Sequence, residues 1–333
     1  MSKSGKARRV TMKDIAEATG YTVNTVSHAL KDLRDISEET KKIIREKAQE
    51  MGYLTNLVAV SMRSGKTKTL AIIIPDIANP YFATKVKEMD ALLRENGYSS
   101  IIINTDENSE FEFEAVRTAI SRKVDGIIIC PTQKRTDVFD LIIANSIPYV
   151  VLGRKFPGRL FYSVVWDDVR AGYLATEHLI SQGKRRILYL NGPAHISSSN
   201  DRLAGYKLCL EKHGIPYDEA LVIEADIVET LGCNCIYSIL EKQVVFDAIF
   251  AFSDFIAFAA IDTLQILKMD VPIVGVDDIL SDLNLPIRLS SVGVRKDIEA
   301  HAIIKMLFEQ MKSTSTSAPH IVVIETFLLD RDN

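Results

Sequence analysis

The stretch that decides the fold spans residues 10–30 and reads VTMKDIAEATGYTVNTVSHAL. Thr11 is a preferred helix-capping residue type, and it precedes a segment that we predict to be helical over residues 12–19. Gly20 permits a sharp turn, and Thr22 begins a second short helix. Two short helices joined by a tight turn are typical of a DNA-reading helix-turn-helix.

The second helix, which we expect to end at Leu30, has an inner and an outer face. Val26, Ala29 and Leu30 follow the i, i+3, i+4 spacing of a stripe that packs inward. The other side chains are expected to face outward, and these are Val23, Asn24, Thr25, Ser27 and His28. Short polar side chains on that face can meet base edges and phosphate groups.

A third helix is predicted from the capping residue Ser37 to the residue before Gly52, which stops it. Its packing face is expected to consist of Ile43, Ile44, Ala48 and Met51. A three-helix domain of this size also suits a protein-binding module, so the helix pattern alone leaves two functions open.

Charge separates the N-terminal part from the rest of the 333-residue chain. Residues 1–66 contain 13 Lys and Arg against 8 Asp and Glu, whereas the remainder contains 27 against 36. A basic head on an acidic body indicates a polyanionic partner for the head alone. No apolar run approaches the ~20 residues of a membrane helix. No apolar segment follows the basic tail of residues 1–9, so we expect a cytoplasmic protein without a membrane partner.

Beyond residue 66, apolar strand patterns alternate with helical patterns. The first set has strands at 70–75, 100–104, 126–130 and 148–152, and helices at 81–96, 110–122 and 137–145. The second set has strands at 163–166, 187–191, 221–224, 248–251 and 273–276, and helices at 169–182, 202–212, 230–241 and 255–267. Such strands form parallel sheets covered on both faces. We therefore predict an α/β body of two doubly wound parallel-sheet subdomains with a cleft between them.

Ligands of such sheets bind at the carboxyl ends of the strands. Polar and aromatic residues at the predicted strand ends are Asp76, Asn79, Tyr81, Phe82, Asn104, Asp106, Thr132, Arg154, Asp167, Asp168, Ser253, Asp254, Asp277 and Asp278. In addition, Asp201 and Arg202 are expected to open a helix after a serine-rich loop of residues 197–199.

Nothing in the sequence points to catalysis. The adjacent aspartates at 167/168 and 277/278 are expected to point to opposite faces, so they cannot easily share a proton or a metal ion. The histidines follow no nucleophile or metal-ligand spacing, and Ser64–Thr67 resembles a phosphate-binding loop only in its last residues. We read Cys130, Cys209, Cys233 and Cys235 as reduced thiols. We predict a protein that is not an enzyme, without catalytic residues, metal or cofactor.

Residues 11–28 match T-x-K-D-I-A followed by G-x-T-V-x-T-V-S-H, and residues 52–65 add Gly52-Tyr53, Asn56, Ala59 and the run SMRSG. In these motifs the chain resembles the LacI/GalR family of bacterial transcription regulators, and the resemblance extends to about Leu329. It implies a helix-turn-helix domain over 10–52, a hinge over 53–66 and a periplasmic-binding-protein-like body over 67–329. Within the body it implies one subdomain of residues 67–164 plus 293–329 and a second of residues 165–292.

The resemblance also implies roles in DNA binding. Val23, Asn24 and His28 would reach base edges, and Met62 would wedge between base pairs in the minor groove, where the family usually has Leu. His28 stands where Arg is common. The remaining expected DNA-binding residues include phosphate contacts, which fix register without reading sequence, and they are Thr11, Thr22, Thr25, Ser27, Ser37, Tyr53, Asn56, Ala59 and Arg63.

For the body, the resemblance implies that Arg202 grips adjacent hydroxyls or a carboxylate and that Asp277 accepts hydrogen bonds from hydroxyls. The expected effector-binding residues are Asn79, Tyr81, Phe82, Arg154, Arg202, Ser253, Asp254 and Asp277. Plainer readings stay open, because Arg202 suits a salt bridge and Tyr81 and Phe82 suit the core. The chain departs from the family pattern at Gly153, Ser253, Val294 and Arg295, which predicts an atypical effector and allosteric crossover.

The combined hypothesis is a repressor that binds a palindromic operator as a homodimer and is switched by a small-molecule effector, a sugar or sugar derivative. The C-terminal residues show no heptad run, so we do not expect a tetramer built by a C-terminal coiled coil. Alternatives are a nucleobase, a phosphorylated metabolite or a protein corepressor as the switching ligand. A sugar-binding protein whose head binds protein also remains open.

Overall fold

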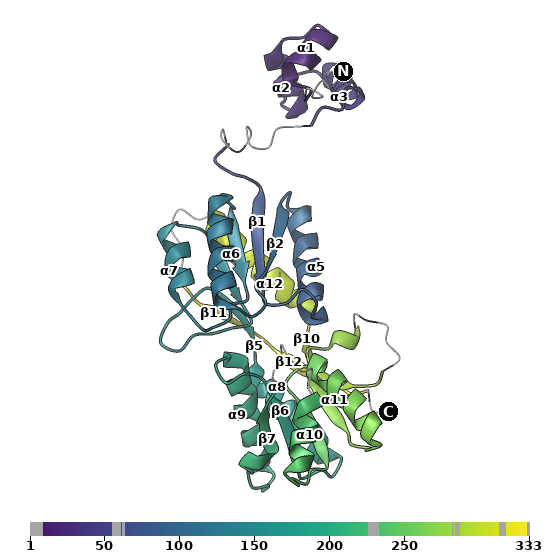
Figure 1. The fold of residues 1–333 in the computed structure, drawn as a ribbon. Helices are drawn as coiled ribbons and strands as arrows, with labels where there is room; N and C mark the ends of the chain where they lie inside the picture. Colours follow the sequence, from purple (N-terminus) through teal and green to yellow (C-terminus); the bar gives the residue numbers. More distant parts are fainter. Residues whose placement is uncertain are drawn as a thin grey trace, which may run out of the picture. The chain divides into compact units, whose positions relative to one another are not determined.

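The computed structural model describes residues 9–54, 61, 64–225, 233–281, 283, 287–312 and 318–331. It divides into two compact units, Met1–Gly65 and Lys66–Asn333, which we call the head and the body and describe separately. The elements are labelled in Figure 1. Most of the expected tail at 1–9 and the expected hinge contacts Asn56, Ala59, Met62 and Arg63 lie outside the described residues.

The head contains three helices whose starts are set by local capping. They are α1 (Met12–Thr19), α2 (Val23–Leu30) and α3 (Glu38–Glu50). Thr11 and Asp14 form a reciprocal capping box at α1, and Gly20 ends α1 with a left-handed φ of 74°. Thr22 and Ser37 cap the next two helices as predicted.

The head core is small, and it corrects two predictions. Its buried side chains are Ile15, Ala16, Val26, Ala29, Ile44 and Ala48. Ile43 is 42% exposed, so its predicted place in the packing face of α3 is wrong. Ser27 is 9% exposed and does not face outward as predicted. The reason is that α2 packs against both α1 and α3, which covers more of its surface than one stripe.

The body contains two six-stranded sheets. The first has the order β11-β5-β4-β3-β1-β2 and is parallel throughout. The second has the order β12-β10-β9-β8-β6-β7, in which β12 alone pairs antiparallel. We call the two halves built on these sheets the first and second lobes. The strands are β1 (Thr69–Ile74), β2 (Ser99–Asn104), β3 (Gly126–Ile129), β4 (Tyr149–Leu152), β5 (Ser163–Trp166), β6 (Ile187–Asn191), β7 (Val222–Glu224), β8 (Ala248–Ala251), β9 (Ile273–Val276), β10 (Ser290–Val294), β11 (Ile321–Ile324) and β12 (Thr326–Leu329).

Helices cover the sheets, as expected for doubly wound lobes. In the first lobe α5 packs on α12 and α6 packs on α7, and Figure 1 shows these pairs on different sides of the sheet. The helices of the body are α5 (Pro80–Glu95), α6 (Ser109–Ser121), α7 (Asp137–Ala144), α8 (Asp168–Ser181), α9 (Ser197–Lys212), α10 (Cys233–Glu241), α11 (Asp254–Leu267) and α12 (Lys296–Lys312), with short 3-10 turns at Glu219–Leu221 and Ile279–Ser281. No helix among the described residues is both long and apolar enough to span a bilayer.

Strand pairing divides the lobes differently from the predicted boundaries. The strand at 163–166 does not open the second set, because Ser163 and Val164 pair with β4 of the first sheet. Conversely, β10 and β12 lie in the second sheet, so the segment 293–329 does not rejoin the first lobe as one piece. Apolar periodicity predicts that these segments are strands, but it carries no information on which sheet edge receives them.

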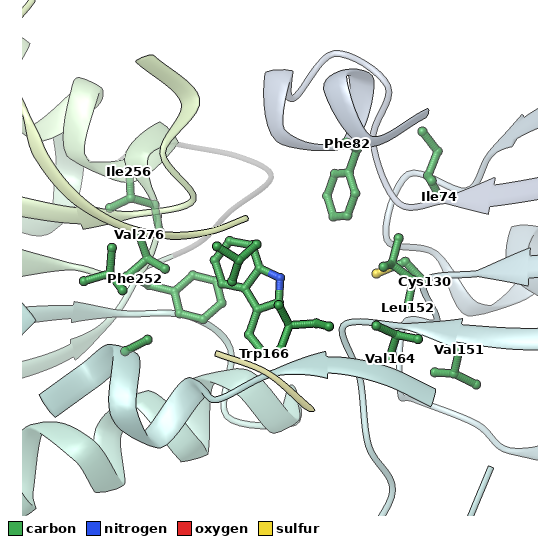
Figure 2. Close-up of a cluster of buried hydrophobic side chains, with 14 of the residues drawn as sticks. Ile74, Phe82, Cys130, Val151, Leu152, Val164, Trp166, Phe252, Ile256 and Val276 are labelled. Carbon is green, nitrogen blue, oxygen red and sulfur yellow. The ribbon is translucent and has the colours of Figure 1, made fainter. Parts of the chain in front are cut away.

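One apolar cluster extends through both lobes. Figure 2 shows the Trp166 ring between side chains of the first lobe, such as Leu152, and side chains of the second, such as Phe252 and Val276. Trp166 ends β5 and is 5% exposed. It therefore lies where the chain passes from the first sheet into α8 of the second lobe.

Candidate DNA-reading and ligand-binding sites

The outer face of α2 presents part of the expected base-reading set. Val23 is 45% exposed, Asn24 is exposed and His28 is partly exposed. Thr25 is half-buried, and its hydroxyl lies 2.9 Å from that of Thr22. A short helix that projects small polar side chains has the shape and chemistry to enter a major groove.

Side-chain hydroxyls cap the N-termini of all three helices of the head. The hydroxyls of Thr11, Thr22 and Ser37 accept backbone N–H groups of the first helical turns at 3.4, 3.1 and 3.2 Å. The ends of α1 and α2 are exposed around these caps, and helix N-termini attract phosphate oxygens. Tyr53, by contrast, packs partly against the head core.

Sequence reasoning missed two polar contacts of the loop between α2 and α3. His28 Nδ1 lies 2.5 Å from Asp35 Oδ2. Asp32 accepts a bond from Arg45 at 2.6 Å and lies 3.1 Å from the ammonium of Lys41, and these two cations lower the pKa of its carboxyl group. Seven to thirteen residues separate these partners, so no local sequence motif predicts the contacts.

In the body, a cavity opens at the carboxyl ends of strands from both sheets. Its lining residues are Asn79, Tyr81, Phe82, Glu107, Arg154, Ser198, Arg202, Phe252, Ser253 and Asp277. The structure thus gathers seven of the eight predicted effector residues around one cavity. The exception is Asp254.

Arg202 is held rigidly at the cavity wall. Its Nε donates to Asp168 at 2.8 Å, its Nη1 donates to the carbonyl of Phe252 at 2.5 Å, and its guanidinium lies 4.5 Å from the centre of the Phe252 ring. This position depends on close contact of α8 with α9, because a Cβ at Gly172 would lie 2.0 Å from the Arg202 carbonyl oxygen. The salt-bridge reading of Arg202 is therefore confirmed, and the residue also lines the cavity.

Asp277 carries a carboxylate toward the same cavity. It is 6% exposed, has a φ of 117°, and its side chain makes no hydrogen bond within the described part of the chain. Burial raises the pKa of Asp277 well above its usual range, and the nearby Arg202 opposes that shift. A buried carboxylate without hydrogen bonds is costly, so hydroxyl or N–H donors of a ligand would stabilise it.

At the other end of the cavity Arg154 faces Glu107 and Ser198. Arg154 Nη1 donates to Ser198 Oγ at 3.2 Å, while its Nε is buried without a partner among the described residues. Burial raises the pKa of Glu107. Sequence reasoning missed Glu107 and Ser198, although Glu107 lies three residues after the end of β2 and the strand-end rule would have included it. The sequence predicts a loop for residues 197–199, whereas they form the first turn of α9.

Polar contacts, which we call the rim contacts, connect the lobes beside the cavity. Gln133 Oε1 accepts the Ser197 N–H at 2.8 Å, and the Lys155 N–H donates to Ser197 Oγ at 3.1 Å. The Lys155 ammonium also lies 2.5 Å from Asp201. Gln133 and Lys155 belong to loops of the first lobe, and Ser197 and Asp201 belong to α9 of the second.

Asp254 makes hydrogen bonds within the second lobe and does not line the cavity. Its carboxylate accepts bonds from Ser291 Oγ at 2.6 Å and from the Ile279 N–H at 2.8 Å, and burial raises its pKa to about 7. The Asp254 carboxylate can approach β9 this closely because residue 275 is glycine, since a Cβ there would lie 2.1 Å from Asp254 Oδ1. The prediction placed Asp254 in the cavity because it follows a strand, but this carboxylate turns toward β10.

The two members of each adjacent aspartate pair lie in different surroundings, as predicted. Asp167 caps α8 by accepting from the Arg170 N–H, whereas Asp168 binds Arg202. Asp278 accepts from Arg331, away from the cavity that Asp277 lines. No group of three or more His, Cys, Asp or Glu in the described ranges is placed to hold a metal ion.

A buried ion pair that no local sequence pattern predicts connects α5 with α12. Lys85 of α5 bonds Glu299 of α12, and Glu299 also accepts from Trp166 Nε1 at 2.9 Å. The Lys85 ammonium lies 4.6 Å from the centre of the Tyr81 ring. Tyr81 in turn packs edge-on against Trp166, so its predicted core role and its place in the cavity wall are both realised.

Cys130 and Cys209 are buried free thiols, with pKa values raised by burial to about 11 and about 12. The side chains of Cys233 and Cys235 lie outside the described part.

A helix-turn-helix head followed by a two-lobed body with a polar cavity is an architecture of DNA-binding transcription regulators. Comparison with known proteins supports this class. Residues 11–56 match the model of bacterial regulatory proteins of the lacI family, and residues 67–271 match that of periplasmic binding proteins and the sugar binding domain of the LacI family. The chain belongs to the LacI family of bacterial transcription regulators.

Relatives and solved structures agree with this assignment. The chain is 30% identical to the HTH-type transcriptional regulator DegA of Bacillus subtilis (strain 168), covering 84% of this chain and 85% of DegA. It is 28% identical to a transcriptional repressor PurR of Actinobacillus pleuropneumoniae, with 92% of each covered. A structure of the regulator CelR in complex with cellobiose superposes with a TM-score of 0.71 at 26% identity, covering 97% and 99%. The lac repressor dimer bound to operator shares the fold at a TM-score of 0.81 and 20% identity, covering 97% and 98%.

Proposed function

We propose that this regulator is a repressor that binds a palindromic operator as a homodimer and is released or recruited by a sugar or sugar derivative. The observation that carries the effector part is the cavity, where Arg202 and Asp277 lie beside the aromatic rings of Tyr81 and Phe252. Fixed donors and acceptors beside apolar rings suit a ligand with adjacent hydroxyls on an apolar ring face. The relative CelR, whose structure holds cellobiose, supports this class of ligand.

The DNA part of the proposal rests on the face of α2. Val23, Asn24 and His28 read base edges, while Thr25 and the capping residues contact phosphates. Tyr53 and the hinge residues Asn56, Ala59, Met62 and Arg63 complete the contact set, with Met62 as the minor-groove wedge. Two heads related by a two-fold axis require a palindrome. Ile102, 46% exposed on edge strand β2, offers apolar area to a partner subunit.

The switch in this proposal is a change in the angle between the two lobes. The cavity is lined from both lobes, so a ligand that contacts both binds one lobe arrangement more tightly than the other. Such a differential affinity changes the population of the DNA-binding state, and operator and effector affect each other's affinity reciprocally. The protein then acts as a regulator rather than an enzyme, in the cytoplasm where chromosomal DNA lies.

Calorimetry against a metabolite panel tests the effector class. The panel should hold neutral monosaccharides and disaccharides, sugar phosphates and nucleobases. Binding of a neutral sugar that is lost in Asp277→Asn supports the proposal. Binding of ligands without hydroxyl groups only would contradict it and favour a nucleobase, and binding limited to phosphorylated compounds would favour a phosphorylated metabolite.

Salt dependence tests the DNA partner against a protein partner. For duplex DNA the logarithm of the binding constant falls with the logarithm of salt concentration by roughly 0.9 per neutralised phosphate. A flat response would favour a head that binds protein. A protein corepressor would appear as a body that binds no member of the metabolite panel.

A further inference from the structure

The contact between His28 and Asp35 carries an inference about how the head reads DNA. We propose that Asp35 is a positioning residue that determines base specificity: it holds the Nδ1–H of His28, so that Nε2 is the nitrogen presented to a base edge. This rests on the proposed role of His28 as a base-reading residue.

The geometry fixes the position of the proton. His28 Nδ1 and Asp35 Oδ2 are 2.5 Å apart, with side-chain exposures of 30% and 55%. An ionised carboxylate can only accept, so Nδ1 must carry the hydrogen. A hydrogen bond to an ionised group is shorter and stronger than a neutral one, so it restrains both the rotation of the ring and the choice of tautomer.

The loop that carries Asp35 is itself anchored to both neighbouring helices. The Leu33 N–H donates to the carbonyl of His28 at 3.1 Å, which ties the loop to the end of α2. Asp32 bonds Arg45 of α3 at 2.6 Å and lies 3.1 Å from the Lys41 ammonium. Asp35 therefore reaches His28 from a loop that is already ordered, and pre-organised supporting contacts of this kind hold a recognition group in one geometry.

Several charged side chains on the neighbouring helices pair with groups other than His28. On α3, Lys41 and Arg45 are directed to Asp32. On α1, Lys13 pairs with Glu17. Asp35 is thus the charged group that hydrogen-bonds the His28 ring in the described head.

This arrangement gives Nε2 two distinct reading states. When the imidazole is protonated, Nε2–H donates, and it matches the N7 and O6 acceptors of guanine. When the imidazole is neutral, Asp35 retains the proton on Nδ1, and Nε2 accepts from the amino group of adenine or cytosine. Without Asp35 either nitrogen can carry the proton and the ring can turn.

The test is a selection of duplex DNA from a random library with the full-length protein, followed by affinity measurements on single-base variants of the selected site. The variants are Asp35→Ala, Asp35→Asn, His28→Ala and the double variant His28→Ala with Asp35→Ala. We expect Asp35→Ala to reduce discrimination at one base pair about tenfold, the range of a good base contact. Asp35→Asn, whose amide oxygen still accepts the Nδ1–H, should restore most of it. In the His28→Ala background, Asp35→Ala should change nothing at that position.

Several outcomes overturn the inference. An equal effect of Asp35→Ala with and without His28 would show that Asp35 does not act through the ring. Uniform weakening on all sequences would show a purely structural role. Circular dichroism checks that each variant folds. If Asp35→Ala unfolds the head, the isosteric Asp35→Asn replaces it in the comparison with and without His28. We then expect a smaller loss of base discrimination, which should also vanish in the His28→Ala background. Enrichment of a sequence in which no position responds to His28→Ala overturns this inference and leaves DNA reading intact, whereas no enrichment at all counts against the proposed function.

Discussion

The head and the body place their charged side chains differently. In the head, ion pairs such as Arg45 with Asp32 lie at the surface, with side chains 46% and 65% exposed. In the body, Arg202 and Asp168 are each 6% exposed, and Lys85 and Glu299 are buried as deeply. Exposed pairs contribute about 0–1 kcal/mol, whereas a buried charge that loses its partner destabilises strongly. Apart from Lys41, which is buried, the head thus keeps most of its charges available to a polyanion, whereas the body holds fixed charges around a cavity.

The largest expected effect comes from breaking a buried pair at the cavity. Arg202→Ala leaves Asp168 buried without its cation, and we expect the free energy of unfolding of the body to fall by about 3–5 kcal/mol. Ligand binding should be lost as well. Urea unfolding followed by circular dichroism measures the change. The matched control in the head, Arg45→Ala, should cost less than about 1 kcal/mol. Equal losses in the two variants would show that burial does not separate the two regions.

Asp277→Asn separates binding from stability within the body. Its carboxylate makes no hydrogen bond in the described structure, so the amide should leave the ligand-free body as stable as before or slightly more stable. Sugar binding should weaken by roughly 10- to 100-fold, the value of one or two hydrogen bonds to a charged group. Calorimetry and thermal unfolding of the same preparation give both quantities. A destabilised body with unchanged ligand affinity would show that Asp277 is structural.

The two regions should also differ in their response to pH. Burial raises the pKa of Asp254 and of Glu112 to about 7, above the value near 4 of an unfolded carboxyl. The folded body therefore binds more protons, and its stability should fall as pH rises from about 4 to 7. The pKa of Asp32 in the head is lowered, so its contribution is present above pH 4 and is lost as pH falls below that value.

Unfolding of the full-length chain between pH 4 and 8, with Asp254→Asn as the matched variant, measures this slope. The variant should flatten the loss of body stability with rising pH. A slope that is unchanged in Asp254→Asn would assign the pH dependence to other groups.

The smallest effect is expected at the rim contacts. Lys155→Ala removes a partly exposed ion pair with Asp201 that connects the lobes. We expect a change of only a few-fold in ligand affinity, because the pair is worth about 1 kcal/mol or less. Lys134→Ala, which removes a contact within the first lobe, is the control. Small-angle scattering with and without ligand shows whether the lobes of the variant are more open. If Lys155→Ala and Lys134→Ala have the same ligand affinity and the same scattering, the rim contacts do not contribute to lobe closure.

Local chemistry made the head predictable. Thr11, Gly20, Thr22 and Ser37 act within one turn of themselves, so the starts of all three helices follow from the sequence. The errors lie where packing partners decide exposure: Ile43 is turned out, and Ser27 is covered because α2 packs on two sides.

The body was predictable only as far as its strands. Apolar runs located them, but the edge that receives β5 or β12 depends on pairing with segments far away in the chain. The same limit applies to the cavity. The strand-end rule led to Arg154, whereas Arg202 followed from the family resemblance. The rule misplaced Asp254, because its hydrogen-bonding partner Ser291 lies 37 residues further along the chain.

The most direct test of the account is the affinity for a selected palindromic duplex with and without a saturating sugar identified by calorimetry. The account predicts that the dissociation constant changes by at least fivefold on ligand addition, the lower end of typical allosteric coupling. It also predicts that this change vanishes in Arg202→Ala. A sugar that binds the cavity while the operator affinity stays the same would contradict it.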